Sequence, residues 1–312
     1  MSRIITVSAL GPRPIAMGAA LTQEERAEYS VRYWLNQLDR VMPDNPSLVV
    51  LPEYCDIGEG VWGDELKEYV RVRGERVLDS LSGYAKTNRC AIAYSSVAES
   101  GGQLYNAIRM IGSDGEIAGT YCKNHPVTTE MSGNGILCGT DAPLIQCGFG
   151  SVSCLICFDL NFEDMLEKYR HNRPDILIFS SMYHGGIMQQ YWAYTCQSHF
   201  IGACAGLPCT VLSPLGEIIA SSSVHVPFVV AKINLDCRVV HIDENMEELR
   251  AAKKKYGTGV DISTPGYSNL LVVSSLREDR TANDILAEFA IEPWDDYYRR
   301  SLKQHCISMF DA

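Results

Sequence analysis

The sequence lacks the features of a membrane protein and of a nucleic-acid-binding protein. No apolar run approaches the ~20 residues that span a bilayer, and residues 1–11 are too short and polar for the apolar region of a secretion signal, so they predict a first strand. Acidic residues outnumber basic residues by 38 to 27, for a net charge of −11. Because nucleic acids and anionic membranes bind basic patches, we expect neither as a partner.

The sequence also lacks a linker, a low-complexity tract and a solenoid repeat, although its 312 residues would allow two domains. With 46% hydrophobic residues, the chain can bury a large core. We therefore predict one main domain over residues 1–280 and a C-terminal tail over residues 281–312. Aromatic residues among the charges of this tail predict packing on a neighbouring subunit, in a homodimer or larger homo-oligomer: Trp294, Tyr297 and Tyr298.

Twelve cysteines in a chain of this length do not suggest the disulfide framework of a small secreted domain. Several lie in apolar segments, as Cys154 and Cys204 do, which is typical of buried free thiols. A reducing cytoplasm is therefore the expected compartment. Cys154 and Cys157 form a Cys-x-x-Cys motif, but no second pair completes a zinc site, and residues i and i+3 of a strand point to opposite faces. We expect no metal and no cofactor, with metal or disulfide use of this pair as the alternative.

Hydrophobic periodicity predicts alternating strands and helices over the first half of the chain. Residues 48–51 form a continuous apolar run, as in a strand covered on both faces. Residues 24–41 and 65–86 have the spacing of amphipathic helices, and residues 240–256 are predicted to be largely helical. This alternation, with inserted hairpins, predicts an α/β sheet with helices outside. Two such halves packed sheet to sheet would form a four-layer sandwich, which periodicity alone does not establish.

Three predicted strands end at a residue with a reactive side chain. Residues 48–52 lead into Glu53, residues 116–122 lead into Lys123, and the apolar strand 152–156 stops at Cys157 before a polar turn and a helix. The carboxyl ends of strands are where α/β proteins place reactive groups. Taken singly, each residue has an ordinary alternative: a solvated turn glutamate, a surface lysine and a core cysteine. Their joint placement predicts an active site with a carboxylate, an ammonium and a thiol.

These groups can perform nucleophilic catalysis on a carbonyl or nitrile carbon. Cys157 would attack as a thiolate, and Glu53 would accept the thiol proton, pass it to a leaving amine and then activate water. Lys123 would stabilise the thiolate and the developing oxyanion, with the backbone N–H of Phe158 as a second donor. Glu130, seven residues after Lys123, would orient Lys123 or the substrate amide.

Residues at strand ends are also the candidates for substrate contacts. Besides Phe158, we expect Tyr54, Tyr183 and His184 to line the pocket, together with residues 124–125. For His184 the alternative is a loop histidine hydrogen-bonded to the backbone. No arginine near these segments is an evident partner for a substrate carboxylate, so the charge of the substrate stays undetermined.

The sequence resembles the nitrilase (carbon–nitrogen hydrolase) superfamily from about residue 3 to residue 235. The resemblance rests on residues 49–54, 119–126, 154–162 and 214–220. It implies a four-layer αββα sandwich and a catalytic triad of Glu53, Lys123 and Cys157, with Glu130 as a second glutamate. It also implies a thioester or thioimidate intermediate and homodimers or larger assemblies.

The sequence departs from the superfamily pattern in two segments, residues 161–164 and residues 193–198, and one residue pair bears on the branch. Residues 161–164 read Asn-Phe-Glu-Asp where relatives often have Arg-Phe-Pro-Glu, which puts the usual ion pairing of this helix in doubt. The Phe158–Asp159 pair resembles the amidase and carbamoylase branches more than nitrilases. We therefore expect hydrolysis of a small amide, ureido or N-carbamoyl compound with release of ammonia. The alternatives are hydrolysis of a nitrile through a thioimidate and a catalytically silent binding or scaffold protein on the same fold.

Overall fold

The computed structural model describes residues 3–18 and 20–310, with side chains to residue 306. The chain divides into two compact units. The larger unit spans Ile5–Ile233, and the smaller unit is formed mainly by residues 234–310. The site predicted from the sequence lies entirely in the larger unit.

The larger unit contains two six-stranded sheets. In the first sheet the parallel strands β1, β2 and β3 continue into the antiparallel strands β4 and β5. Its strands, in spatial order, are β12 (Phe228–Asn234), β1 (Ile4–Leu10), β2 (Leu48–Val50), β3 (Ala91–Ser100), β4 (Gln103–Ile111) and β5 (Ile117–Cys122). The second sheet has the order β11 (Ile218–Ser221), β10 (Thr210–Leu212), β9 (His199–Cys204), β8 (Ile176–Ser181), β7 (Gly150–Ile156) and β6 (Ile145–Cys147), with β7, β8 and β9 parallel.

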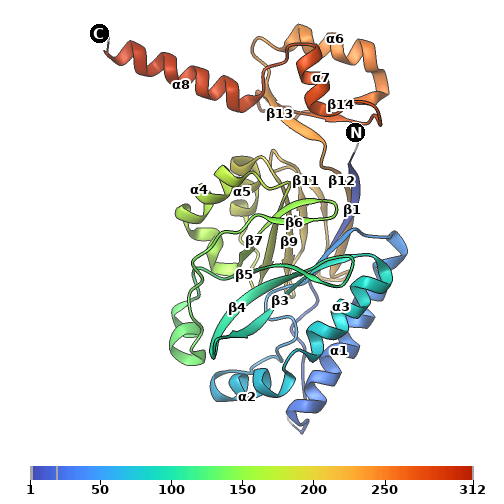
Figure 1. Ribbon diagram of the computed structural model, residues 1–312, viewed down its shortest axis with the longest axis vertical. Coiled ribbons are helices and arrows are strands. Elements are labelled where there is room, and N and C mark those ends of the chain that lie inside the picture. Colours follow the sequence, from blue (N-terminus) through green and yellow to red (C-terminus); the bar gives the residue numbers. More distant parts are fainter. Residues whose placement is uncertain (1–2, 19, 311–312) are drawn as a thin grey trace. The chain divides into compact units, whose positions relative to one another are not determined.

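Helices cover the outer faces of both sheets. As Figure 1 shows, α1 (Gln23–Asp39) and α3 (Arg76–Asn88) lie outside the first sheet, whereas α4 (Glu163–Asn172) and α5 (Ile187–Cys196) lie outside the second. Apolar residues of α1 and α3 pack on those of β2 and β3 in one buried cluster that includes Trp34, Leu38, Val49, Leu81 and Ile92. The inner faces pack on each other, and the Ser180 hydroxyl in β8 donates to Leu51 O, 2.7 Å away, at the end of β2. This arrangement confirms the αββα sandwich.

Two helix predictions were wrong in detail. Residues 65–86 form two helices, α2 (Gly63–Arg73) and α3, because the chain bends at Gly74, whose φ of +52° is a conformation that glycine adopts without strain. Residues 240–241 belong to a strand, β13 (Cys237–His241), and the helix α6 starts only at residue 246 (Met246–Tyr256). Val240 is fully buried opposite Leu271, so packing of this β-branched residue in a sheet overrides the helical pattern.

The smaller unit is built around a three-stranded antiparallel sheet. Its strands are β13, β15 (Leu270–Ser275) and β14 (Val260–Ser263), and they pack against α6 and α7 (Ala282–Glu288). The last helix is α8 (Trp294–Phe310), from which Trp294 and Tyr297 stack on His241 of β13. The predicted boundary at residue 280 and the packing of residues 281–312 on a neighbouring subunit stay predictions.

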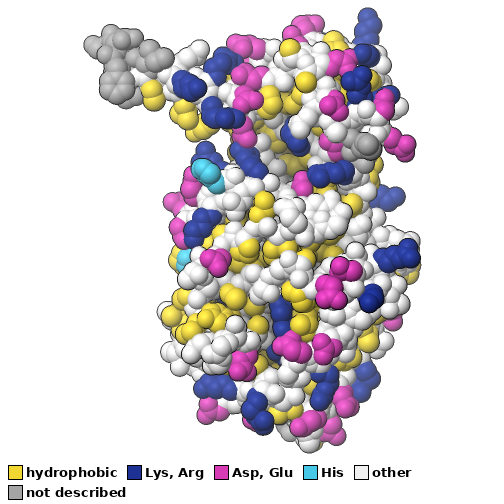
Figure 2. All heavy atoms as spheres, viewed as in Figure 1, with side chains coloured by type: hydrophobic (Ala, Val, Ile, Leu, Met, Phe, Trp, Pro, Cys, Tyr) yellow, Lys and Arg dark blue, Asp and Glu magenta, His cyan; other side chains and the backbone are white. Residues whose placement is uncertain are grey.

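Short helical turns complete the secondary structure: η1 (Met42–Asp44), η2 (Glu130–Asn134), η3 (Cys157–Asn161) and η4 (Gly257–Gly259). On the face of the protein in Figure 2, basic side chains are scattered among acidic ones. Within the described part of the chain, no helix is both long enough and apolar enough to cross a membrane.

Candidate active site

The ends of three strands bring Glu53, Lys123 and Cys157 together. Glu53 lies three residues beyond β2, Lys123 follows β5, and Cys157 follows β7. The Lys123 ammonium lies 2.8 Å from Glu53 Oε1 and 2.8 Å from Glu130 Oε2. Glu53, Lys123 and Glu130 are all buried. The structure thus brings together the residues that the sequence analysis selected as catalytic.

The chain around Glu53 is fixed by the neighbouring strand and helix. The N–H groups of Leu51 and Cys55 donate to carbonyls of β3 over 3.1 and 3.0 Å, and the Trp34 indole of α1 donates to Cys55 O over 2.7 Å. Next in sequence, the fully buried carboxylate of Asp56 pairs with Arg73 of α2 over 2.7 Å. Because the chain is held on both sides of Glu53, the Glu53 carboxylate has little freedom to leave the site.

Glu130 lies at the start of the turn η2, where several donors converge on its carboxylate. Val127 N donates to Oε2 over 2.8 Å, and the hydroxyl of Tyr54 donates to Oε1. Burial alone would raise the pKa of this carboxyl, but the Lys123 ammonium and these hydrogen bonds lower it below its usual value. Glu130 is therefore a permanent anion beside Lys123 at neutral pH.

Asn106 is a member of the site that the sequence analysis missed. Its side-chain amide, fully buried in β4, donates to Glu53 Oε1 over 2.8 Å and to Glu130 Oε1 over 2.9 Å. It therefore holds the two carboxylates on either side of Lys123. The available signal was its position, because Asn106 shares a strand face with the buried Ile108 and Met110.

Cys157 occupies a sharp turn between β7 and η3, with a φ of +49°. Its thiol is partly buried, and the groups that act on it include Glu53, Lys123 and Ser181. Burial and the negative charge of Glu53 raise the pKa of the thiol to about 12, against the opposing effect of Lys123. The thiol is therefore protonated at neutral pH, and its reaction as a nucleophile requires a base. Glu53 is the carboxylate whose charge acts on it.

Lys123 keeps its positive charge despite its burial. Burial alone would lower the pKa of its ammonium, but the charges of Glu53 and Glu130 and the hydrogen bond to Glu130 raise it above its usual value. A permanent ammonium in a water-poor site can stabilise a negative charge that develops beside it.

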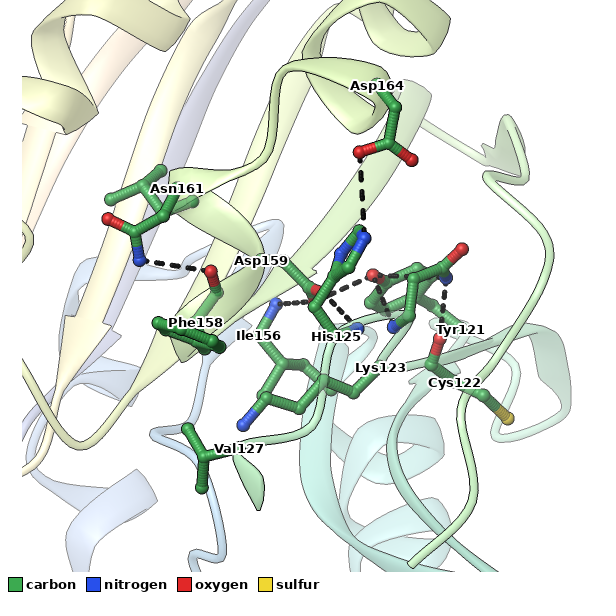
Figure 3. A network of polar contacts seen from close by, with 12 residues as sticks. Tyr121, Cys122, Lys123, His125, Val127, Ile156, Phe158, Asp159, Asn161 and Asp164 are labelled. Atoms are coloured by element: carbon green, nitrogen blue, oxygen red, sulfur yellow. Dashed lines mark hydrogen bonds and ion pairs between the residues drawn. The ribbon is translucent and has the colours of Figure 1, made fainter. Parts of the chain in front are cut away.

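A second network fixes the turn that carries the thiol (Figure 3). The fully buried carboxylate of Asp159 accepts hydrogen bonds from Ile156 N at 3.0 Å, from the Tyr121 hydroxyl at 2.7 Å and from His125 N at 2.8 Å. Tyr121 lies in β5 and Ile156 in β7. Asp159 thus ties the strand end that carries Cys157 to the one that carries Lys123.

His125 belongs to this network. Its Nδ1 lies 3.1 Å from Asp159 Oδ1, its Nε2 lies 3.6 Å from Asp164 Oδ1, and its ring stacks on Phe162 at 3.7 Å. Figure 3 shows the imidazole between the two aspartates. In the segment where the superfamily arginine is replaced by Asn161, the acidic residue Asp164 thus faces a histidine.

The predicted substrate contacts lie in different surroundings. Tyr54, with its hydroxyl on Glu130, lines a pocket beside Glu53, whereas Phe158 is exposed and its ring contacts Phe162. The Tyr183 hydroxyl accepts a hydrogen bond from the Asn161 amide over 3.2 Å. His184 Nδ1 accepts from Gly186 N over 3.1 Å, as in the alternative of a loop histidine bonded to the backbone.

The backbone N–H of Phe158 is a candidate donor to a bound substrate. Phe158 is the second residue of η3, so its N–H has no acceptor within that turn. It directly follows Cys157. A substrate oxygen bound beside Cys157 could therefore receive this backbone donor as well as the Lys123 ammonium.

A pocket of about 460 Å³ adjoins Glu53. This volume is within the range of ~300–1,000 Å³ that is typical of small-molecule sites. Its walls come from the loop after β1, from α1, from the segment after β2 and from the ends of β8 and β9: residues 12–14, 34, 52–55, 57–62, 182 and 205. Apart from Glu53 and Tyr54, no predicted site residue lines it.

Comparison with known proteins identifies the family. Residues 15–230 match the carbon-nitrogen hydrolase family. The chain belongs to this family. A Schizosaccharomyces pombe protein described as a probable nitrilase is 24% identical over 160 residues, which cover 49% of this chain and 58% of that protein. The match thus spans less than two-thirds of the relative.

Solved structures of this hydrolase family show the same fold. Saccharomyces cerevisiae Nit3, a member of branch 10 of the nitrilase superfamily, has a TM-score of 0.65 at 17% identity, with 80% of this chain and 94% of Nit3 covered. A mutant of the amidase from Nesterenkonia sp. AN1 has a TM-score of 0.65 at 14% identity, with coverages of 74% and 90%. These matches confirm the family resemblance, the fold and the class of enzyme predicted from the sequence.

Proposed function

We propose that this carbon-nitrogen hydrolase uses Cys157 to hydrolyse a non-peptide C–N bond in a small amide, ureido or N-carbamoyl compound, releasing ammonia. One observation carries the proposal: the buried carboxylate of Glu53 lies 2.8 Å from the Lys123 ammonium, and its charge adds to burial in raising the pKa of the Cys157 thiol. A base, a nucleophile and a cation in one buried site are the parts that acyl transfer requires.

In the first half-reaction, Glu53 takes the thiol proton as the sulfur of Cys157 attacks the carbonyl carbon. The carbonyl oxygen becomes an oxyanion, which the Lys123 ammonium and the Phe158 N–H stabilise. When the tetrahedral intermediate collapses, the C–N bond breaks and Glu53 passes its proton to the leaving nitrogen. The products are ammonia and a thioester on Cys157.

In the second half-reaction, Glu53 removes a proton from a water molecule that attacks the thioester carbon. The C–S bond breaks, the acid product leaves, and the proton on Glu53 returns to the thiolate. Glu130 and Asn106 act as positioning residues, since their hydrogen bonds keep the Lys123 ammonium and the Glu53 carboxylate beside each other.

The hypothesis of amide hydrolysis is further supported by the solved structure of a relative. The mutant amidase from Nesterenkonia sp. AN1 shows covalent addition of the acetamide moiety of fluoroacetamide at its active-site cysteine. Two alternatives use the same arrangement of thiol, carboxylate and ammonium. It could hydrolyse a nitrile through a thioimidate, or it could be catalytically inactive in a binding protein.

For the cellular setting we propose a reducing cytoplasm and a homo-oligomer. The twelve cysteines, all of them free thiols, support the reducing compartment.

The test is ammonia release from a panel of small amides, N-carbamoyl amines, N-carbamoyl amino acids and nitriles. Cys157→Ala is the blank, and Cys154→Ala is the matched control because it removes a buried thiol from the same strand. We expect turnover of an amide or carbamoyl compound by the wild type and by Cys154→Ala, and none by Cys157→Ala. Ammonia from a nitrile and not from its amide would favour the thioimidate route. If no compound of the panel releases ammonia and Cys157 reacts no faster with iodoacetamide than the other thiols do, a binding protein is favoured.

A further inference from the structure

The pocket beside Glu53 combines apolar walls with one cationic side chain. Ile57, Val61 and Trp62 supply apolar surface, and the Trp62 indole packs so closely on Gly133 that a Cβ there would lie 2.6 Å from Nε1. Gly133 belongs to the turn η2 that carries Glu130. Arg13 is the one lysine or arginine among the lining residues. The pocket is therefore largely apolar, with a positive charge at one point of its wall.

The backbone around Arg13 is held in place. Gly206 N donates to Gly11 O over 3.1 Å and to Pro12 O over 3.0 Å, which ties this loop to the segment after β9. The Arg13 side chain passes over Gly206, where an added Cβ would lie 3.4 Å from Arg13 Cγ. Pro12 and Pro14 flank the arginine and restrict the backbone further. The side chain thus starts from a fixed point at the pocket wall.

The guanidinium of Arg13 is exposed and has no ion-pair partner among the residues that the structure describes. The remaining charged residue of the lining, apart from Glu53, is Glu59, whose N–H donates to Ile15 O over 2.9 Å. Its carboxylate is likewise without an ion-pair partner in the described chain. The wall around Arg13 is mostly apolar. An unpaired guanidinium in such a wall presents a planar fork of donors that matches a carboxylate.

We propose that Arg13 recognises a carboxylate at the distal end of the substrate, so that the enzyme prefers amides whose acyl portion carries a negative charge. This inference rests on the proposed function. Because that reaction releases ammonia, every substrate atom except the amide nitrogen stays on the acyl side of the scissile bond. The pocket next to Glu53 is the space for that acyl portion. The negative charge of Glu59 repels the substrate carboxylate and limits the preference for acidic substrates.

The test compares pairs of substrates that differ in one charge: ω-amides of dicarboxylic acids with three to six carbons, and their methyl esters. The measured quantity is the ratio of kcat/KM for the acid to kcat/KM for its ester. Arg13→Gln should lower this ratio about tenfold, as expected for loss of a charge-assisted hydrogen bond at an exposed site. Glu59→Gln should raise the ratio, and 0.5 M NaCl should lower the wild-type ratio.

Arg32→Gln is the matched control, since it removes the same charge from an exposed position on α1 outside the pocket and should leave the ratio unchanged. An unchanged ratio in Arg13→Gln, or a wild-type ratio below one, overturns the inference while the proposed function stands. If neither acids nor esters are hydrolysed, the wider panel above decides the proposed function. The inference is then decided by calorimetric titration of the same acids into Cys157→Ala. If Cys157→Ala binds the acids and the double variant with Arg13→Gln does not, the inference is supported. If Cys157→Ala does not bind them, or if both variants bind them equally, the inference is overturned.

Discussion

Replacing Glu53 with glutamine should make the Cys157 thiol more acidic and the enzyme inactive. With a pKa of about 12, five units above neutrality, about one thiol in 10⁵ is ionised at pH 7. The charge of Glu53 contributes to that value, whereas Lys123 opposes it. Glu53→Gln removes the negative charge and leaves the ammonium, so the pKa of Cys157 should fall. Turnover should nevertheless drop by about 10²–10⁴-fold, the usual effect of losing a general base.

The assay is the rate of iodoacetamide alkylation of the Cys157 peptide between pH 6 and pH 10, measured by mass spectrometry in the wild type and in Glu53→Gln. The exposed Cys138 serves as an internal reference in each sample, because its rate should be the same in both proteins. Ammonia release on the same preparations reports turnover. Slower or unchanged alkylation of Cys157 in the variant would refute the electrostatic account, and retained turnover would refute the role of Glu53 as base.

Three further perturbations test the surroundings of the thiol. Lys123→Met leaves Glu53 and Glu130 buried without a cation, which should cost about 3–5 kcal/mol of unfolding free energy in a denaturant titration; a stability equal to that of the wild type would contradict this. The pKa of the Glu130 carboxyl lies below its ordinary 4.5, so its ion pair stabilises the fold above that pH and is lost as the pH falls through the lowered pKa. The decline in Tm below pH 4.5 should therefore be shallower in Glu130→Gln than in the wild type, and parallel curves would exclude this contribution. Asp159→Asn should lower kcat about tenfold or more with little change in KM, because the donors around residue 159 lose a full carboxylate and the turn at Cys157 shifts; a change confined to KM would place Asp159 in substrate binding instead.

The candidate catalytic residues could be selected from the sequence because each follows a strand. Glu53, Lys123 and Cys157 follow apolar runs whose period and length identify strands, and the ends of neighbouring strands converge in a sheet. A sheet with helices outside it could be predicted for a similar reason, since alternating elements must bury one face each. The resemblance to the superfamily added the pairing of the two sheets.

Other parts of the site depend on contacts that no local pattern encodes. Asn106 interrupts an apolar face, but only the folded sheet shows that its amide meets Glu53 and Glu130. Arg13 lies 40 residues before Glu53 in the sequence, in a loop whose position is set by hydrogen bonds to Gly206. Its place in the pocket wall depends on that distant contact, so the sequence analysis found no arginine for a substrate carboxylate.

His125 and Val240 show how packing overrides local expectation. A histidine near Lys123 suggested a pocket residue, whereas the ring stacks on Phe162 and lies beside two aspartates. Val240 had the spacing of a helix, yet a β-branched side chain facing Leu271 is better accommodated in a sheet. Both outcomes follow from partners that are distant in the sequence.

The most direct test of the account is the detection of an acyl group on Cys157 during turnover. The enzyme is mixed with the best substrate of the panel, quenched in acid within milliseconds to seconds, and digested for mass spectrometry. The account predicts that the Cys157 peptide gains the mass of the acyl group, that hydroxylamine removes it, and that Cys157→Ala shows neither the adduct nor ammonia release. Ammonia release by Cys157→Ala at the wild-type rate would contradict the account.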